Sequence, residues 1–323
     1  MRSIVTGSGG FLGGHLTGAL LERGDEVVAA DIKPLGEWLQ VHPEAANRPE
    51  VDLGIWQNAL GLADGCDRIY HFAADVGGMG FISAHKAACT LNILADAQMV
   101  RTAQAFGARI WYASSACIYP LHLQQTADAL PLREDDALAG VQPEEAYGWA
   151  KIFAERMYLA HAADYGTEVR IGRYQSAFGP RGVYRGGREK APTAICRKVA
   201  TAKLTGAKSI EVWGDGTAIR TFTYIDDAVA ATLKITEGDY GLPLNVGSSE
   251  AMSIEELVAA IEDIAGWPVE RVWTDGPVGV PGARRNDPSL AAEKAGWKAE
   301  VSVREGLERT YRDVYDRVKA DLA

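Results

Sequence analysis

The sequence predicts an α/β fold in which a doubly wound parallel sheet is joined by a smaller mixed α/β lobe. Short apolar strands alternate with helical patterns through the first half of the chain, as in a parallel sheet with helices on both faces. The chain opens on a strand, a glycine turn and a helix. Its 323 residues exceed one average domain and leave room for the second lobe.

The opening segment has the glycine spacing of a dinucleotide-binding loop. An apolar strand is followed by Gly7, Gly10 and Gly13 at Gly-x-x-Gly-x-x-Gly spacing. Gly7 permits a tight turn, Gly10 lets the backbone approach a pyrophosphate, and Gly13 lets the helix lie close to the strand. The first helical turn, which includes Phe11 and Leu12, then offers unpaired N–H groups to the phosphates.

Asp31 stands at the end of the second predicted strand, Glu26–Ala30, which follows a helix over Phe11–Glu22. A carboxylate at this place accepts both ribose hydroxyls of NAD and repels the 2′-phosphate of NADP. We therefore predict a Rossmann-type domain that binds NAD. Asp52, after the next loop, is expected either to contact the adenine or to cap a helix.

The chain is expected to divide into two parts. Residues 1–178 form the NAD-binding Rossmann domain, and residues 220–250 complete it with a helix and a last strand. The composition changes after Gly179-Pro180. We therefore assign residues 179–323 mainly to a substrate-binding lobe.

Composition limits the partners. The net charge of −10 argues against nucleic acid and anionic membranes. No apolar run approaches the ~20 residues that span a bilayer, and no signal-peptide pattern is present, so we expect a cytoplasmic protein. The cysteines lack metal-ligand spacing, and no metal site is predicted. They are Cys66, Cys89, Cys117 and Cys196.

Two further segments are expected to face a ligand, because ligands bind at the carboxyl ends of parallel strands. Gly77, Gly78 and Met79 lie in a loop after the third strand, where bare backbone lets a substrate pass closely. Ser115 and Cys117 follow the fourth strand.

Tyr147 and Lys151 lie one turn apart on the helix predicted over Tyr147–Asp164. An ammonium at this spacing, with a nicotinamide cation nearby, lowers the pKa of a phenol from its usual value of ~10 towards working pH. The pair indicates a phenol that acts as an acid or base.

Basic residues gather in the second half of this acidic chain, which favours a phosphate-bearing ligand. Between residues 181 and 208 only Glu189 is acidic, and Arg220, Arg284 and Arg285 follow later. The basic residues in that interval are Arg181, Arg185, Arg188, Lys190, Arg197, Lys198, Lys203 and Lys208.

The glycine loop, Asp31, Ser115 and the Tyr147-x-x-x-Lys151 pair resemble the extended short-chain dehydrogenase/reductase superfamily, which modifies nucleotide sugars. More specific stretches resemble its GDP-mannose 3,5-epimerase family. They are Ala73-Ala74-Asp75-Val76-Gly77-Gly78-Met79-Gly80-Phe81-Ile82, Ser114-Ser115-Ala116-Cys117-Ile118-Tyr119-Pro120, Gly186-Gly187-Arg188-Glu189-Lys190-Ala191-Pro192 and Trp213-Gly214-Asp215-Gly216.

The resemblance implies roles for particular residues. Ser115, Tyr147 and Lys151 correspond to the dehydrogenase core, and Cys117 and Lys190 to the acid/base pair that epimerises the sugar. Gly77, Lys198 and Arg285 correspond to substrate contacts. A homodimer through the helices Ser83–Phe106 and Tyr147–Asp164 is also implied.

The chain departs from the family at two places. Gln175-Ser176 stands where the family has His-Asn, and Ala218-Ile219-Arg220 stands where it has Gln-Thr-Arg. Both departures remove amide groups expected near the diphosphate or the sugar, so the identity of the nucleotide sugar is left open.

The expected reaction is transient oxidation at carbon 4 by NAD, inversion of carbon 5, carbon 3 or both, and return of the hydride, giving GDP-L-galactose or GDP-L-gulose. A ketone at carbon 4 is needed because it makes the neighbouring C–H bonds acidic. A nucleotide-sugar 4-epimerase or 4,6-dehydratase is the alternative enzyme. The alternative outside catalysis is an NAD-sensing module, although such modules tend to lose the Tyr or Lys present here.

Overall fold

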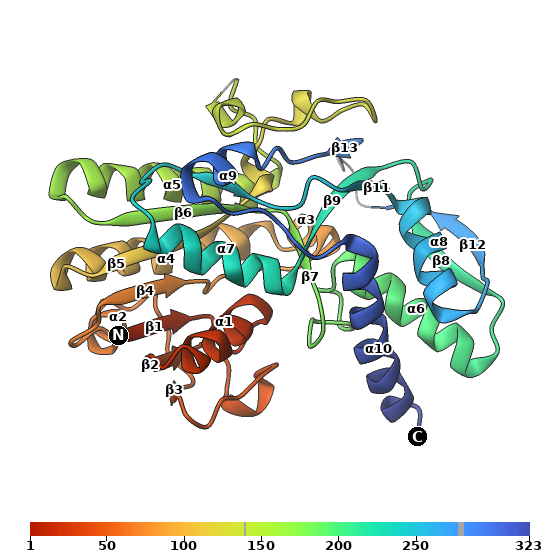
Figure 1. Cartoon of the computed structure of the whole chain (residues 1–323), viewed down its shortest axis with the longest axis horizontal. Coiled ribbons are helices and arrows are strands. Elements are labelled where there is room, and N and C mark those ends of the chain that lie inside the picture. The colour runs from red at the N-terminus through yellow and green to blue at the C-terminus, as the bar shows by residue number, and fades with distance from the viewer. Residues whose placement is uncertain (139, 277–280) are drawn as a thin grey trace.

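A seven-stranded parallel sheet forms the centre of the larger part of the molecule (Figure 1). In the computed structural model, which describes residues 1–138, 140–276 and 281–323, the strands follow the order β10-β6-β5-β4-β1-β2-β3. This arrangement confirms the predicted doubly wound sheet. The strands are β1 (Arg2–Thr6), β2 (Glu26–Ala30), β3 (Ala46–Arg48), β4 (Arg68–His71), β5 (Arg109–Ser115), β6 (Val169–Tyr174) and β10 (Leu244–Val246).

Helices cover both faces of this sheet because its strands carry apolar residues on both sides. In β1, Ile4 belongs to the core under one set of helices and Val5 to the core under the other, as the alternation of a strand requires. The first set is α2 (Trp56–Leu62), α4 (Lys86–Phe106) and α5 (Glu145–Tyr165), and the second is α1 (Phe11–Glu22), α7 (Ile225–Glu237) and α9 (Ser289–Ala295).

The smaller part has its own apolar core, built from α6 (Ala191–Thr205), α8 (Ile254–Ala265) and α10 (Val303–Asp321) (Figure 1). Strand β8 (Ser209–Trp213) pairs with β12 (Glu270–Thr274) in a two-stranded parallel sheet. Strand β9 (Ile219–Tyr224) pairs with three short strands and lies between the two parts. These strands are β7 (Ser176–Phe178), β11 (Ala251–Ser253) and β13 (Ala283–Arg284).

The helix predicted over Ser83–Phe106 is wrong at its start, because two helices meet there. Helix α3 (Met79–Ala84) ends at His85, whose φ of −120° and ψ of 47° are not helical, and α4 begins with Lys86. The His85 ring stacks on Phe81 at a centroid distance of 4.3 Å. This local packing fixes the break, which apolar periodicity does not reveal.

Within residues 220–250, α7 packs against the seven-stranded sheet and β10 is one of its strands, whereas β9 belongs to the four-stranded sheet. The division into an NAD-binding and a substrate-binding part remains a prediction. None of the helices in the described ranges is long and apolar enough to cross a membrane.

Candidate active site

The turn after β1 is shaped to receive a dinucleotide. Gly7 has a φ of +74°, and a Cβ atom there would lie 2.8 Å from the backbone nitrogen of Ala73. A Cβ atom at Gly13 would lie 2.3 Å from the carbonyl oxygen of Gly7. Gly10 caps α1 without a side chain, so the first turn with Phe11 and Leu12 keeps its N–H groups for a phosphate. The cradle therefore fits the pyrophosphate of NAD.

Asp31 lies buried beside this turn and holds it in place. Its Oδ2 accepts the N–H of Gly9 at 2.9 Å, and its Oδ1 accepts the N–H of Lys33 at 3.0 Å. Because each carboxylate oxygen has a second lone pair, Asp31 still has capacity for ribose hydroxyls.

Asp52 shapes a turn and does not cap a helix. Its Oδ1 accepts the N–H of Gly54 at 2.8 Å, whereas Ile55 is the N-cap residue of α2. Of the two expected roles for Asp52, capping is therefore wrong, and the adenine contact remains a prediction.

Lys151 and Tyr147 meet beneath the carboxyl end of β5. The Lys151 Nζ donates to the carbonyl oxygen of Ala113 at 2.9 Å and lies 5.9 Å from the centroid of the Tyr147 ring. Burial raises the pKa of Tyr147, and the Ser115 hydroxyl acts in the opposite direction. Burial also lowers the pKa of Lys151. Protein groups alone therefore do not lower the phenol pKa, and the expected lowering depends on the nicotinamide cation.

Ser115 positions Cys117. The Ser115 Oγ accepts the N–H of Cys117 at 3.2 Å, which starts a 3₁₀ turn over Ala116–Ile118 at the end of β5. Burial raises the pKa of the Cys117 thiol to about 11. The Nη1 of Arg284 lies 3.5 Å from the Cys117 Sγ.

Two loops dock together and bring Lys190 to this place. The N–H of Gly78 donates to the carbonyl oxygen of Arg188 at 3.0 Å, and the Arg188 guanidinium pairs with Asp75 at 2.6 Å. A Cβ atom at Gly78 would lie 2.4 Å from the carbonyl oxygen of Glu189. Only glycine permits this close approach of the two loops. The second loop ends at Lys190, the N-cap residue of α6.

Lys190 and Cys117 act on each other electrostatically. Burial lowers the pKa of Lys190, and the negative charge of a Cys117 thiolate would raise it. The structure thus brings together residues that the sequence spreads over three segments, namely Ser115, Cys117, Tyr147, Lys151 and Lys190. One group with a raised pKa and one with a lowered pKa suit a pair that exchanges protons with a substrate.

The remaining predicted substrate contacts have protein partners of their own. Lys198 donates to the carbonyl oxygen of Glu211 at 2.6 Å, and Arg285 donates to that of Ala127 at 3.0 Å. Arg220 donates to the carbonyl oxygen of Pro281 at 2.8 Å. Gly77, which is followed by Gly78 and Met79, packs against Phe81 and Arg188. Their contacts with a substrate remain predictions.

Sequence reasoning missed Glu144 and underrated Arg284. The two form a buried ion pair next to Cys117. Of the neighbouring arginines, Arg284 and not Arg285 reaches the thiol. Arg284 is the last residue of β13 and Arg285 follows that strand, and no signal in the sequence separates the two arginines. Nothing in the local sequence marks Glu144.

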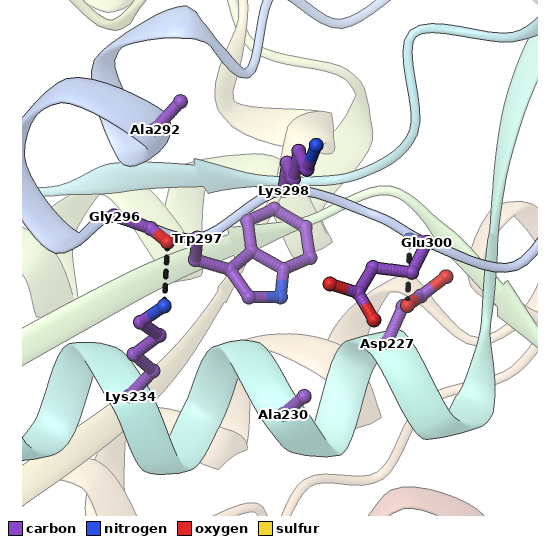
Figure 2. Close-up of a pocket in the computed structure, with 8 residues that line it drawn as sticks. All are labelled: Asp227, Ala230, Lys234, Ala292, Gly296, Trp297, Lys298 and Glu300. Atoms are coloured by element: carbon purple, nitrogen blue, oxygen red, sulfur yellow. Dashed lines mark hydrogen bonds between the residues drawn. The ribbon is translucent and has the colours of Figure 1, made fainter.

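A cleft of about 340 Å³ lies elsewhere, between α7 and the segment that follows α9 (Figure 2). Trp297, Lys234 and Glu300 line it, and Lys234 donates to the carbonyl oxygen of Gly296 at 2.6 Å. None of its lining residues is a predicted site residue, so it is separate from the candidate active site.

A family model described as "NAD dependent epimerase/dehydratase family" matches residues 3–247. The chain belongs to this family. Membership of the NAD dependent epimerase/dehydratase family confirms the predicted cofactor, and the glycine cradle described above fits it.

Relatives that are 36% identical to this chain carry the name GDP-mannose 3,5-epimerase. GDP-mannose 3,5-epimerase of Arabidopsis thaliana is 36% identical over 325 residues, which cover 100% of this chain and 84% of that protein. GDP-mannose 3,5-epimerase 1 of Oryza sativa subsp. japonica is 36% identical over 323 residues, which cover 99% of this chain and 83% of that protein. These relatives confirm the family resemblance and the assignment to the isomerases.

Solved structures share the fold. UDP-glucose 4-epimerase of Thermotoga maritima superposes with a TM-score of 0.88 at 22% identity and covers 98% of this chain and 100% of its own. MoeE5 in complex with UDP-glucuronic acid and NAD gives a TM-score of 0.81 at 26% identity, with 99% and 100% covered. The Rossmann-type α/β class is therefore confirmed.

Proposed function

We propose that this protein is a GDP-mannose 3,5-epimerase that inverts carbon 5, carbon 3 or both. The convergence of Cys117 and Lys190 at the carboxyl end of β5 carries the proposal. A 4-epimerase needs Tyr147 and Lys151 but has no use for a second acid/base pair. The relatives named GDP-mannose 3,5-epimerase support the choice of substrate.

Tyr147 begins the reaction in this proposal. Bound NAD supplies the hydride acceptor for oxidation at carbon 4 and returns the hydride at the end. Tyr147 takes the proton of the carbon-4 hydroxyl, while Ser115 hydrogen-bonds the reacting oxygens. Lys151, anchored on the carbonyl oxygen of Ala113, stabilises the phenolate through its charge.

Cys117 and Lys190 then act on the two faces of the sugar ring. The ketone at carbon 4 makes the hydrogens on carbons 3 and 5 acidic, because the charge of the carbanion spreads onto oxygen. One of the two residues removes a proton and the other delivers one to the opposite face. Burial favours the neutral forms of both side chains, so a neutral amine can accept a proton, whereas the thiol must first lose its proton if it is to act as the base.

The test is an incubation with GDP-mannose in heavy water, followed by NMR. Deuterium at carbon 3 or carbon 5 is expected. Cys117→Ala and Lys190→Ala should still oxidise carbon 4, seen as NADH absorbance, while epimer formation falls ~10²–10⁴-fold. Near-normal epimer formation by either variant removes that residue from the mechanism. Inversion at carbon 4 alone, without deuterium uptake, identifies a 4-epimerase instead.

We also propose a homodimer through α4 and α5. The two helices pack against each other, and both expose large apolar side chains to the solvent, a feature that marks protein interfaces. Leu91 is 61% exposed, Leu94 51%, Trp149 52% and Phe153 60%. Phe153→Asp should halve the mass measured by light scattering, and an unchanged mass excludes this surface. The cytoplasmic location expected from the sequence stays a prediction.

A further inference from the structure

The Glu144–Arg284 ion pair contacts Cys117 and plays no part in the mechanism above. The Arg284 Nη2 donates to the Glu144 Oε2, and its Nη1 lies 3.5 Å from the Cys117 Sγ. The N–H of Glu144 donates to the carbonyl oxygen of Cys117 at 2.9 Å. The side-chain oxygen of Gln124 accepts a hydrogen bond from the Arg284 Nε at 2.8 Å and so holds the guanidinium in place. Backbone and side chain therefore both tie this pair to the cysteine.

One oxygen of the pair is left without a partner. The Oε1 of Glu144 is buried and accepts no hydrogen bond from any residue in the described ranges. Glu144 itself is only 1% exposed. A buried carboxylate oxygen in this state is costly and calls for an explanation. The thiol of Cys117 is a hydrogen-bond donor that contacts the same guanidinium.

We propose that the Oε1 of Glu144 accepts the proton of the Cys117 thiol and returns it during the reaction. The S–H bond breaks as the O–H bond forms, and the negative charge moves from the carboxylate to the sulfur. The proton stays within the cluster, so the net charge of the cluster is unchanged, and the Arg284 guanidinium contacts both groups. This inference rests on the proposed function, since it supplies the proton exchange that Cys117 requires there.

The neighbours of Cys117 leave Glu144 as the suitable acceptor. The charged and titratable groups that act on the thiol are Glu144, Tyr147, Lys190, Arg220 and Arg284. Arginine cannot accept a proton. Tyr147 and Lys190 are assigned to the carbon-4 hydroxyl and to the opposite face of the ring. The Glu144 carboxylate alone is anionic, buried and unassigned.

A thiol in this setting needs a local acceptor. Burial first, and then the charge of Glu144, raise the pKa of Cys117 to about 11, while Arg284 lowers it. The thiol is therefore protonated at neutral pH. If the proton were released to solvent, the thiolate would be left as an additional buried charge, which is costly. Transfer of the proton to the adjacent carboxylate avoids this cost.

Glu144→Gln tests the proposal with two readouts that should move in opposite directions. The rate of iodoacetamide labelling of Cys117 against pH, followed by peptide mass spectrometry, reports the pKa of the thiol. This pKa should fall below about 11 because a negative charge is removed. Deuterium uptake into the epimerised carbon should nevertheless fall ~10²–10⁴-fold, because the proton acceptor is lost.

Glu145→Gln is the matched control, since Glu145 forms an ion pair with the half-exposed Lys86 at 2.8 Å. It should change neither readout. The proposal is overturned if Glu144→Gln takes up deuterium at a rate within threefold of the unchanged protein. It is also overturned if the thiol pKa in this variant is unchanged or higher.

The double variant Glu144→Gln/Arg284→Gln removes both buried charges, so no unpaired charge is left to unfold the site. Deuterium uptake should stay lost. Its recovery would show that Glu144→Gln acted by misplacing Arg284, which overturns the role of Glu144 as acceptor. Cys117→Ala distinguishes failure of the proposed function from failure of the proposed role of Glu144. Normal epimer formation in that variant overturns the proposed function itself, whereas lost epimer formation in Cys117→Ala with normal epimer formation in Glu144→Gln overturns only this inference.

Discussion

Replacement of Glu155 by Gln should destabilise the protein through one buried ion pair. Glu155 on α5 pairs with Arg173 on β6, and their side chains are 3% and 6% exposed. The guanidinium donates to Oε1 at 3.0 Å and to Oε2 at 2.8 Å, and the Ser114 hydroxyl also donates to Oε1. Donors therefore face both carboxylate oxygens. A glutamine would place its NH₂ group against one of these donors and leave the Arg173 charge uncompensated.

The size of the effect follows from this geometry. Breaking a buried ion pair by removing one charge costs about 3–5 kcal/mol. A chain of 323 residues has an unfolding entropy of about 0.7 kcal/mol/K near 60 °C, from about 2.1 cal/mol/K per residue. The melting temperature should therefore fall by about 4–7 °C.

Differential scanning calorimetry measures this shift, and urea unfolding measures the loss of free energy. Glu237→Gln is the control, because Glu237 is 48% exposed and bonds Arg23 and Arg68 at the surface. Exposed pairs contribute about 0–1 kcal/mol. If Glu155→Gln lowers the melting temperature no more than Glu237→Gln does, the buried pair does not stabilise the fold as argued.

Three further changes probe the cofactor site and the first chemical step. Tyr147→Phe should abolish deuterium uptake and NADH absorbance without a change in melting temperature, and any remaining uptake at carbon 5 shows that oxidation is not the first step. Gly13→Ala places a Cβ atom 2.3 Å from the carbonyl oxygen of Gly7 and should displace the helix terminus, which loses ~1.4 kcal/mol or more of phosphate binding. The affinity for NAD, measured by calorimetry, should therefore fall at least about tenfold. Gly36→Ala is the control, because a Cβ atom at Gly36 lies in open space, and it should leave the affinity unchanged. Asp31→Ala should reduce the preference for NAD over NADP in paired titrations, and an unchanged preference contradicts its assignment to the ribose.

The sequence alone predicts the features that depend on contiguous residues. The turn with Gly7, Gly10 and Gly13 is specified by backbone sterics within one strand–turn–helix unit, and a Cβ atom at Gly7 or Gly13 would collide with the backbone. Tyr147 and Lys151 share a helix face because of helical periodicity. The doubly wound sheet follows from the alternation of strands and helices.

The surroundings of Cys117 are decided only by tertiary structure. Arg284 lies 167 residues from Cys117 in the sequence, and Lys190 arrives through the docking of two glycine-containing loops. Glu144 carries no local sign of its burial against the thiol. Long-range packing sets which charges face one another and which are desolvated, and the pKa values of Cys117 and Lys190 depend on that packing. Local sequence identifies the residue types available for catalysis, whereas the fold determines their partners.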